Sequence, residues 1–212
     1  MALTLRDTAH HTYREYRAWS EDVRYELIDG VAYLMAPTPA RVHQEVVGEM
    51  YRQTANTLHG RPCRPFIAPF DVRLPRGTES DDQVDTVVQP DLLVVCDPLK
   101  LDERGMRGAP DWVVEVLSPA SASHDQTIKL AAYERAGVSE VWVVHPTDRT
   151  VTSTGWRARA TAGPPFTKPK EILWWGLFLK YVSTGVWFFQ RPSLRALLTS
   201  QFGSFSKKSL VT

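Results

Sequence analysis

Apolar residues gather in three short runs in the middle of the chain, and each run has the length of a β-strand. The runs are residues 89–96, 111–117 and 140–145, and a helix-like pattern over 124–136 separates the last two. Strands that are apolar throughout are typical of a sheet covered by helices on both faces. The predicted fold class is therefore α/β or α+β, with a central mixed β-sheet flanked by helices.

The helix over 124–136 has recognisable signals at both ends. Residues 123–126 match a capping box, and Gly137 supplies a left-handed C-cap. The i, i+3, i+4, i+7 rule then assigns one face of this helix to a single set of side chains. That set is Asp125, Lys129, Ala132, Tyr133 and Ala136.

The N-terminal half is predicted to contain several further elements. They are a short helix over 12–19, a hairpin over 25–35 that turns at Asp29-Gly30, a helix from Thr38-Pro39 to near Gly60, a strand over 66–74 and a loop over 75–87. The long helix presents an inward stripe of Val46, Met50, Thr54 and Leu58.

Charge divides the chain into two unequal parts. The net charge of the 212 residues is +1, but residues 1–148 hold 15 basic and 23 acidic residues, a balance of −8. Residues 149–212 hold 10 basic residues and one acidic residue, a balance of +9. Phosphate binding normally relies on Lys and Arg, so the acidic part counts mildly against a nuclease. A bound metal, a local basic patch or the basic tail could offset this.

The composition changes at about residue 155, which predicts two parts, a domain over 1–155 and a basic, Trp-rich segment over 156–212. Residues 172–189 reach the lower limit of a membrane span. A central Lys180 there costs roughly 3 kcal/mol on insertion scales, so terminal strands or a helix closing the core are favoured over a span. A replaced tail, through a sequence change or frame shift, is a third explanation of this segment.

The two cysteines, Cys63 and Cys96, lie far apart and form no CxxC pair. Neither a disulfide framework nor a structural zinc site is expected. The N-terminus lacks the architecture of a signal peptide. We therefore predict a reduced, cytoplasmic protein without a membrane partner.

Two of the apolar strands each carry one carboxylate, Asp91 and Glu115. An ionised carboxylate in an apolar sheet costs several kcal/mol unless a cation compensates it, and a metal ion is one such cation. Two carboxylates and a backbone carbonyl such as that of Val116 suit Mg²⁺, which would activate a water molecule for phosphodiester hydrolysis. Alternatively, Asp91 caps the turn after Pro90 and Glu115 pairs with an arginine.

Lys129 is a candidate to orient the attacking water and stabilise charge on the phosphate. It shares its helix face with apolar residues and follows the Glu115 strand closely, although a simple i, i+4 pair with Asp125 is the alternative. Supporting candidates are His43, Glu45, Glu49, Asp71, Gln89 and Asp125. Each has an ordinary explanation as well: the helical glutamates can be solvated, the histidine can pack or cap, and Asp71 can pair with Arg73.

An ordered set of motifs resembles a known family. The set is Tyr25-Glu26-Leu27-Ile28-Asp29-Gly30, Val88-Gln89-Pro90-Asp91, Glu115-Val116-Leu117-Ser118-Pro119, then Asp125, Lys129, Tyr133 and Gly137-Val138. Over residues 12–152 it resembles the Uma-type putative restriction endonuclease family, a member of the PD-(D/E)xK nuclease superfamily. One departure is Leu117, where the superfamily motif has lysine. In the family that lysine lies on the following helix, which matches Lys129.

The resemblance implies a restriction-endonuclease-like core and a metal-dependent endonuclease, acting on DNA and often homodimeric. It implies Asp91 and Glu115 as the metal ligands, with Mg²⁺ as the cofactor and Mn²⁺ as a substitute. A catalytically inactive binding or regulatory module of the same fold is the alternative function. A membrane-tethered protein using residues 172–189 is a third.

Overall fold

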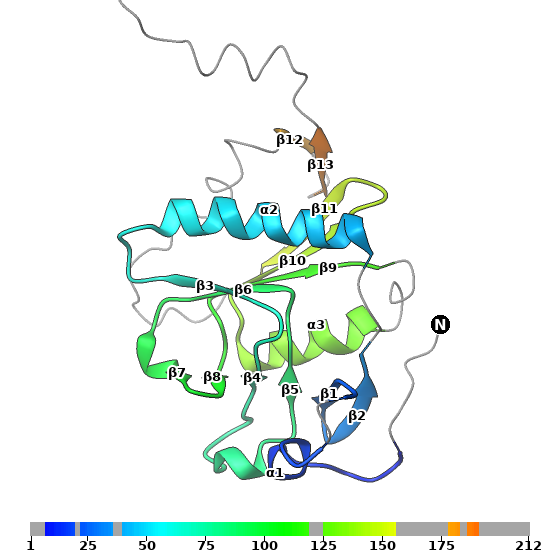
Figure 1. The fold of residues 1–212 in the computed structure, drawn as a ribbon, viewed down its shortest axis with the longest axis vertical. Helices are drawn as coiled ribbons and strands as arrows, with labels where there is room; N and C mark the ends of the chain where they lie inside the picture. The colour runs from blue at the N-terminus through cyan, green and yellow to red at the C-terminus, as the bar shows by residue number, and fades with distance from the viewer. Residues whose placement is uncertain are drawn as a thin grey trace, which may run out of the picture.

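The computed structural model describes residues 7–19, 22–35, 40–118, 125–155, 178–182 and 186–190. Within them the chain forms two mixed β-sheets with helices against them (Figure 1). Sheet A consists, in spatial order, of β2 (Val31–Leu34), β1 (Tyr25–Ile28), β5 (Val87–Val88), β4 (Val72–Arg73), β8 (Gly105–Arg107) and β7 (Leu101–Asp102). Sheet B consists of β12 (Phe178–Val182), β13 (Val186–Gln190), β11 (Thr150–Gly155), β10 (Glu140–His145), β9 (Trp112–Val116), β6 (Leu92–Val95) and β3 (Arg64–Ile67).

The helices are α1 (Tyr13–Tyr16), α2 (Arg41–Leu58) and α3 (Asp125–Ala136), with 3₁₀ turns η1 (Asp81–Gln83) and η2 (Pro98–Lys100). Helices α2 and α3 lie on opposite sides of sheet B (Figure 1). Trp112 and Val114 of β9 pack in one core cluster with Met50 of α2, whereas Val113 packs in another with Tyr133 of α3. The predicted mixed α+β fold class is confirmed. The second β-sheet was not predicted.

The predicted hairpin is present, and its turn explains its register. Strands β1 and β2 pair antiparallel, with Ile28 opposite Val31. Asp29 and Gly30 both have positive φ, 53° and 78°. Two left-handed residues are the requirement of a type I′ turn, which Asp-Gly meets readily.

Helix α2 begins later than predicted. Its N-cap is Ala40, and Thr38 and Pro39 lie outside the described residues, so the expected start at Pro39 is corrected to Arg41. Its buried side chains are His43, Val47, Met50, Gln53, Thr54 and Leu58, while Val46 is half-buried. The predicted stripe is therefore right except that Val47 is more deeply buried than Val46.

Helix α3 ends where the sequence predicts. Gly137 has φ 84°, its N–H bonds to Glu134, and the N–H of Val138 bonds to Tyr133, which is a Schellman motif. The predicted capping box begins at residue 123, outside the described residues.

Of the predicted strands, one is broken in two and another is shortened. Residues 66–74 divide into β3 of sheet B and β4 of sheet A, with Pro69 between them. Residues 89–96 yield only β6, because the chain leaves β5 of sheet A at Val88 and enters sheet B at Leu92. Proline has no N–H for a ladder, so Pro69 and Pro90 end the pairing at these points. We call residues 89–91 the seam between the two sheets. The short strands β7 and β8 lie between the predicted strands 89–96 and 111–117, where no strand was predicted.

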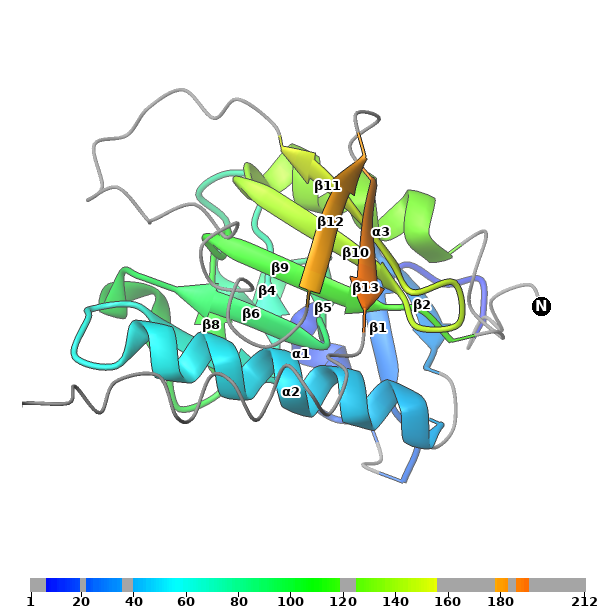
Figure 2. The same ribbon diagram turned by 90° about the horizontal axis from the view of Figure 1, so that it is seen from above.

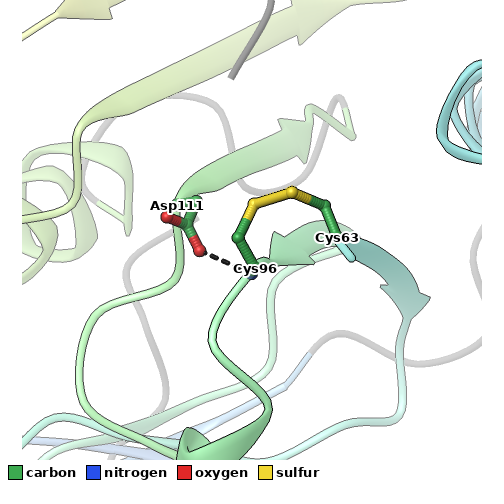
Figure 3. The surroundings of a disulfide bond; sticks show 3 residues. All are labelled: Cys63, Cys96 and Asp111. Carbon is green, nitrogen blue, oxygen red and sulfur yellow. Dashed lines mark hydrogen bonds between the residues drawn. A yellow bond between two sulfur atoms is a disulfide. The ribbon is translucent and has the colours of Figure 1, made fainter. Parts of the chain in front are cut away.

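The expectation of unpaired cysteines is wrong. Cys63 and Cys96 form a disulfide with a sulfur–sulfur distance of 2.06 Å (Figure 3). Arg64 pairs with Val95 across β3 and β6, so the two cysteines are the next opposed pair despite a sequence separation of 33. The backbone N–H of Cys96 also donates to Asp111 at 2.8 Å. The argument for a reduced compartment therefore loses its basis.

Part of the segment beyond residue 155 forms strands. β12 and β13 form an antiparallel pair, and β13 pairs with β11, which extends sheet B at that edge (Figure 2). Strands were one of the structures expected over 172–189. No helix among the described residues is long and apolar enough to cross a membrane.

Candidate active site

The two predicted carboxylates meet beside the seam. In the antiparallel pairing of β6 with β9, Leu92 lies opposite Val114, and the same register continued by one step places Asp91 opposite Glu115. Directly opposed residues have Cβ atoms about 5 Å apart. The N–H of Val116 donates to Asp91 Oδ2 at 2.7 Å and so fixes the aspartate against β9.

Glu115 is held by two side chains of α3. Lys129 Nζ lies 2.8 Å from Glu115 Oε1, and the Tyr133 hydroxyl donates to the same oxygen at 2.5 Å. Lys129 Nζ also lies 2.9 Å from Glu26 Oε1, on β1 of sheet A. The three charged side chains are only 11–15% exposed. Lys129 thus links the two sheets at their junction.

Burial sets the proton affinities of this group. It raises the pKa of Glu115 to about 7, with repulsion from Asp91 and Glu26 adding to the effect and Lys129 opposing it. Burial also acts to lower the pKa of Lys129, but attraction to Glu115 and Glu26 outweighs it, so the Lys129 pKa lies above its usual value. Lys129 is therefore an ammonium ion at neutral pH, while Glu115 is close to its titration point.

His43 approaches Asp91 from α2. Its Nε2 lies 3.3 Å from Asp91 Oδ1, and the ring is 10% exposed. The hydrogen bond to Asp91 raises the His43 pKa, with a backbone hydrogen bond to Val116 contributing against the opposing effect of burial. Among the described residues its Nδ1 has no partner. Asp91 is thus oriented from two sides, by β9 and by α2.

Gln89 joins the seam to sheet A through several hydrogen bonds. Its backbone N–H donates to Glu26 Oε1 at 2.7 Å, and its amide Nε2 donates to Asp71 at 2.8 Å and to the Tyr16 hydroxyl at 3.0 Å. Arg24 donates to the amide oxygen. Burial raises the pKa of Asp71, which also accepts from Tyr16 at 3.1 Å.

The structure brings most of the predicted residues together. Those at the junction are Asp91, Glu115, Val116, Lys129 and His43, with Gln89 and Asp71 adjoining them. Of the alternatives, Glu115 pairs with a lysine instead of an arginine, and Asp71 pairs with Tyr16 and Gln89 instead of Arg73.

The remaining candidates lie elsewhere. Glu45 pairs with Arg41, and Glu49 pairs with Arg52 at 2.6 Å, all within α2. Both glutamates are solvent-accessible, with side chains 50% and 37% exposed. Their contacts match those of solvated helical glutamates. The side chain of Asp125 lies outside the described part.

Two residues of the junction were missed as site candidates, Glu26 and Tyr133. Glu26 lies in the strand Tyr25–Ile28, flanked by large apolar or aromatic residues. A carboxylate in such a strand is the same signal that singles out Glu115. Tyr133 was assigned to the face of Lys129, and its buried hydroxyl needs a polar partner. Both could have been found from the sequence.

The donor atoms at the junction fit an oxygen-seeking cation. Asp91, Glu115 and the Val116 carbonyl would supply the oxygen ligands of such a cation. Lys129 and Tyr133 both contact Oε1 of Glu115, and no described contact involves Oε2. Among the described residues no group of three or more His, Cys, Asp or Glu side chains is arranged to hold a metal. These donors suit Mg²⁺, which keeps several waters and completes its shell with substrate phosphate.

The fold of the described residues has a counterpart among solved structures. A crystal structure of a putative nuclease belonging to DUF820 from Anabaena variabilis is similar in fold, with a TM-score of 0.56 and 22% sequence identity over 70% of this chain and 80% of that one. A search of curated proteins finds no match. Residues 13–163 match the model of the Uma2 protein family, which is described as a putative restriction endonuclease. The chain belongs to the Uma2 family.

Proposed function

We propose that this protein is a metal-dependent endonuclease that hydrolyses phosphodiester bonds in DNA. The observation that carries the proposal is the placement of Asp91 opposite Glu115, with Lys129 Nζ 2.8 Å from the glutamate. Two carboxylates and a lysine at one strand end are the arrangement of the PD-(D/E)xK superfamily. Here the lysine comes from α3, since Leu117 occupies its usual position.

Asp91, Glu115 and the Val116 carbonyl would hold Mg²⁺, with Mn²⁺ as a substitute. The bound ion would lower the pKa of a water molecule and offset negative charge on the phosphate. The Val116 N–H and His43 fix the Asp91 carboxylate for this role. Such outer contacts orient ligands and are worth about 10–100-fold in affinity or activity.

Lys129 contributes a positive charge beside the reacting phosphate. Its ammonium group carries three N–H donors, and the described contacts direct it to Glu115 and Glu26. A donor held in place before the reaction stabilises charge that develops in the transition state. We assign Lys129 to orient the attacking water and to stabilise that charge.

One observation favours a second candidate, a non-catalytic module of the same fold. Lys129 already lies between two glutamates, and Asp91 already has His43 and Val116 as partners. In such a module these pairs would serve stability alone. Metal binding separates the two candidates, because a structural set of ion pairs has no need of a cation.

The test is cleavage of supercoiled plasmid by the full-length protein with Mg²⁺ or Mn²⁺, and with EDTA as the control. Asp91→Asn, Glu115→Gln and Lys129→Met keep the side-chain shapes while removing charge. We expect each to reduce cleavage about 10²-fold or more, the effect of losing one electrostatic stabiliser. Glu45→Gln, on the exposed side of α2, is the matched control and should cleave as the wild type does.

Thermal unfolding of each variant confirms that it is folded, and calorimetric titration measures binding of Mn²⁺. A folded wild type that neither cleaves nor binds the metal would support the non-catalytic module. Equal cleavage by the wild type and the folded Asp91→Asn protein would exclude this site as the source of activity.

We also propose a homodimer, which the family resemblance implies. Light scattering coupled to size-exclusion chromatography should give twice the chain mass of 24.0 kDa. A mass equal to one chain at all concentrations would contradict it.

A further inference from the structure

Arg24 stands at the solvent side of the acid-rich junction. It immediately precedes β1, and the N–H of Met35 donates to its carbonyl at 2.9 Å, which extends the hairpin ladder to this residue. Side chains two apart on a strand point to the same face, about 7 Å from each other along it. Arg24 therefore shares a face with Glu26, the residue that contacts Lys129. Unlike Glu26, Arg24 is exposed.

The guanidinium of Arg24 donates to a neutral group, and its charge also acts to lower the pKa of Asp71. Its described side-chain hydrogen bond is to the amide oxygen of Gln89, while the amide nitrogen of Gln89 is fixed by Asp71 and Tyr16. A guanidinium has five N–H donors, and this contact occupies a single nitrogen of Arg24. Other arginines of the described part, such as Arg52 and Arg76, contact carboxylates instead.

Negative charge is concentrated around the seam, which favours a further cationic side chain. Four carboxylates gather there, Glu26, Asp71, Asp91 and Glu115; Lys129 contacts Glu26 and Glu115, His43 contacts Asp91, and the charge of Arg73 acts on Asp71. A nucleic acid carries its negative charge on every phosphate, so an acid-rich site repels the phosphates around the reacting one. An arginine recognises phosphate through two parallel hydrogen bonds.

We infer that Arg24 binds a backbone phosphate of the nucleic acid beside the one that is cleaved, with Gln89 holding the guanidinium in position. The inference rests on the proposed function, since it concerns the substrate of that same site. It assigns Arg24 to binding rather than to the chemical step.

The test measures binding of a fluorescein-labelled DNA duplex to the full-length protein in EDTA, over a series of NaCl concentrations. Loss of one phosphate contact reduces the slope of log K against log [NaCl] by about 0.9. We expect this reduction in Arg24→Gln and a retained slope in Arg24→Lys, which keeps the charge. Arg52→Gln removes an exposed arginine of α2, with a side chain 57% exposed, and should leave the slope unchanged.

Cleavage kinetics in Mg²⁺ separate binding from a structural role. Arg24→Gln should raise KM and leave kcat unchanged, because the contact is equal in ground and transition states. A lower kcat together with an unchanged salt slope would assign Arg24 to structure and overturn the inference. In a folded Gln89→Ala background, Arg24→Gln should change the slope less, and an equal change would refute the role of Gln89.

The two proposals fail in different ways. If the wild type neither binds nor cleaves the duplex, the proposed function is wrong and this inference falls with it. If the wild type cleaves and Arg24→Gln keeps the wild-type slope, the inference alone is wrong.

Discussion

Two groups of charged side chains among the described residues are built differently. In sheet A, Arg73 is fully buried and contacts Asp81, Asp102 at 2.6 Å and the carbonyl of Met106 at 3.1 Å, while Arg107 contacts Asp81 at 2.5 Å. We call this the arginine cluster. Its two arginines match its two aspartates. At the junction, Lys129 faces Glu26 and Glu115, with Asp91 beside them, so carboxylates outnumber the lysine.

The proton affinities reflect the difference. Burial acts to raise the pKa of Asp102, but hydrogen bonds from Arg73 and the backbone of Arg104 outweigh it and the pKa is lowered. Burial raises the pKa of Glu115 to about 7, and Lys129 does not cancel the rise. The arginine cluster is electrostatically complete, whereas the junction holds negative charge that a further cation would relieve. Strongly shifted pKa values of this kind gather at functional sites.

Removing the arginine cluster should give the largest effect on stability. Arg73→Met leaves two carboxylates without their cation, and breaking a buried pair costs about 3–5 kcal/mol. Asp81 and Asp102 keep 33% and 46% exposure, which places the expected loss near about 3 kcal/mol. Urea denaturation measures it, with Arg52→Met as the exposed control, expected to lose less than about 1 kcal/mol.

The same variant tests whether the two regions are independent. Where Arg73→Met is still folded, its metal-dependent cleavage should match the wild type. Loss of cleavage in the folded variant would show that the arginine cluster also shapes the site.

Glu115 should make stability depend on pH. Its folded pKa of about 7 lies above the ordinary 4.5, so the folded state binds more protons between these values, and stability falls as pH rises through that window. Between pH 5 and 7.5 in EDTA, the wild type should lose about 2 kcal/mol relative to Glu115→Gln. Asp71 is present in both proteins, so its contribution cancels from the difference in stability. Parallel stability profiles from urea denaturation would contradict the raised pKa.

Tyr133→Phe should give the smallest of the three effects. It removes the 2.5 Å hydrogen bond to Glu115 while keeping the ring. A hydrogen bond to a charged group contributes about 1.5 kcal/mol or somewhat more, and ligand-orienting contacts are worth about 10-fold in activity. Denaturation and plasmid cleavage measure the two losses. An unchanged rate would assign Tyr133 to stability alone.

The sequence predicts best where a local rule is sufficient. Asp29-Gly30 specifies its turn, Gly137 ends α3, and the helical face rule places Lys129 against the strand of Glu115. Each of these depends on a few neighbouring residues. The fold class and the main acid and lysine positions follow from such rules.

What the sequence misses depends on contacts between distant segments. Nothing near Cys63 indicates that β3 and β6 pair in the register that joins it to Cys96. The division of residues 66–74 between two sheets depends on which distant strands pair with the segments before and after Pro69. Glu26, in contrast, could have been found from local sequence, because its strand places a carboxylate among apolar residues, as the strand of Glu115 does. Only its partner Lys129 is remote in sequence.

The shared position of Lys129 between Glu26 and Glu115 has a consequence for the molecule as a whole. One glutamate belongs to sheet A and the other to sheet B, so a single ammonium group contributes to holding the two sheets together. Because Lys129 contacts both glutamates, a change in its interaction with one glutamate is coupled to its interaction with the other. Under the proposed function, a cation bound at Glu115 would therefore weaken the contact of Lys129 with Glu115, and this contact between the sheets would in turn oppose binding of the cation.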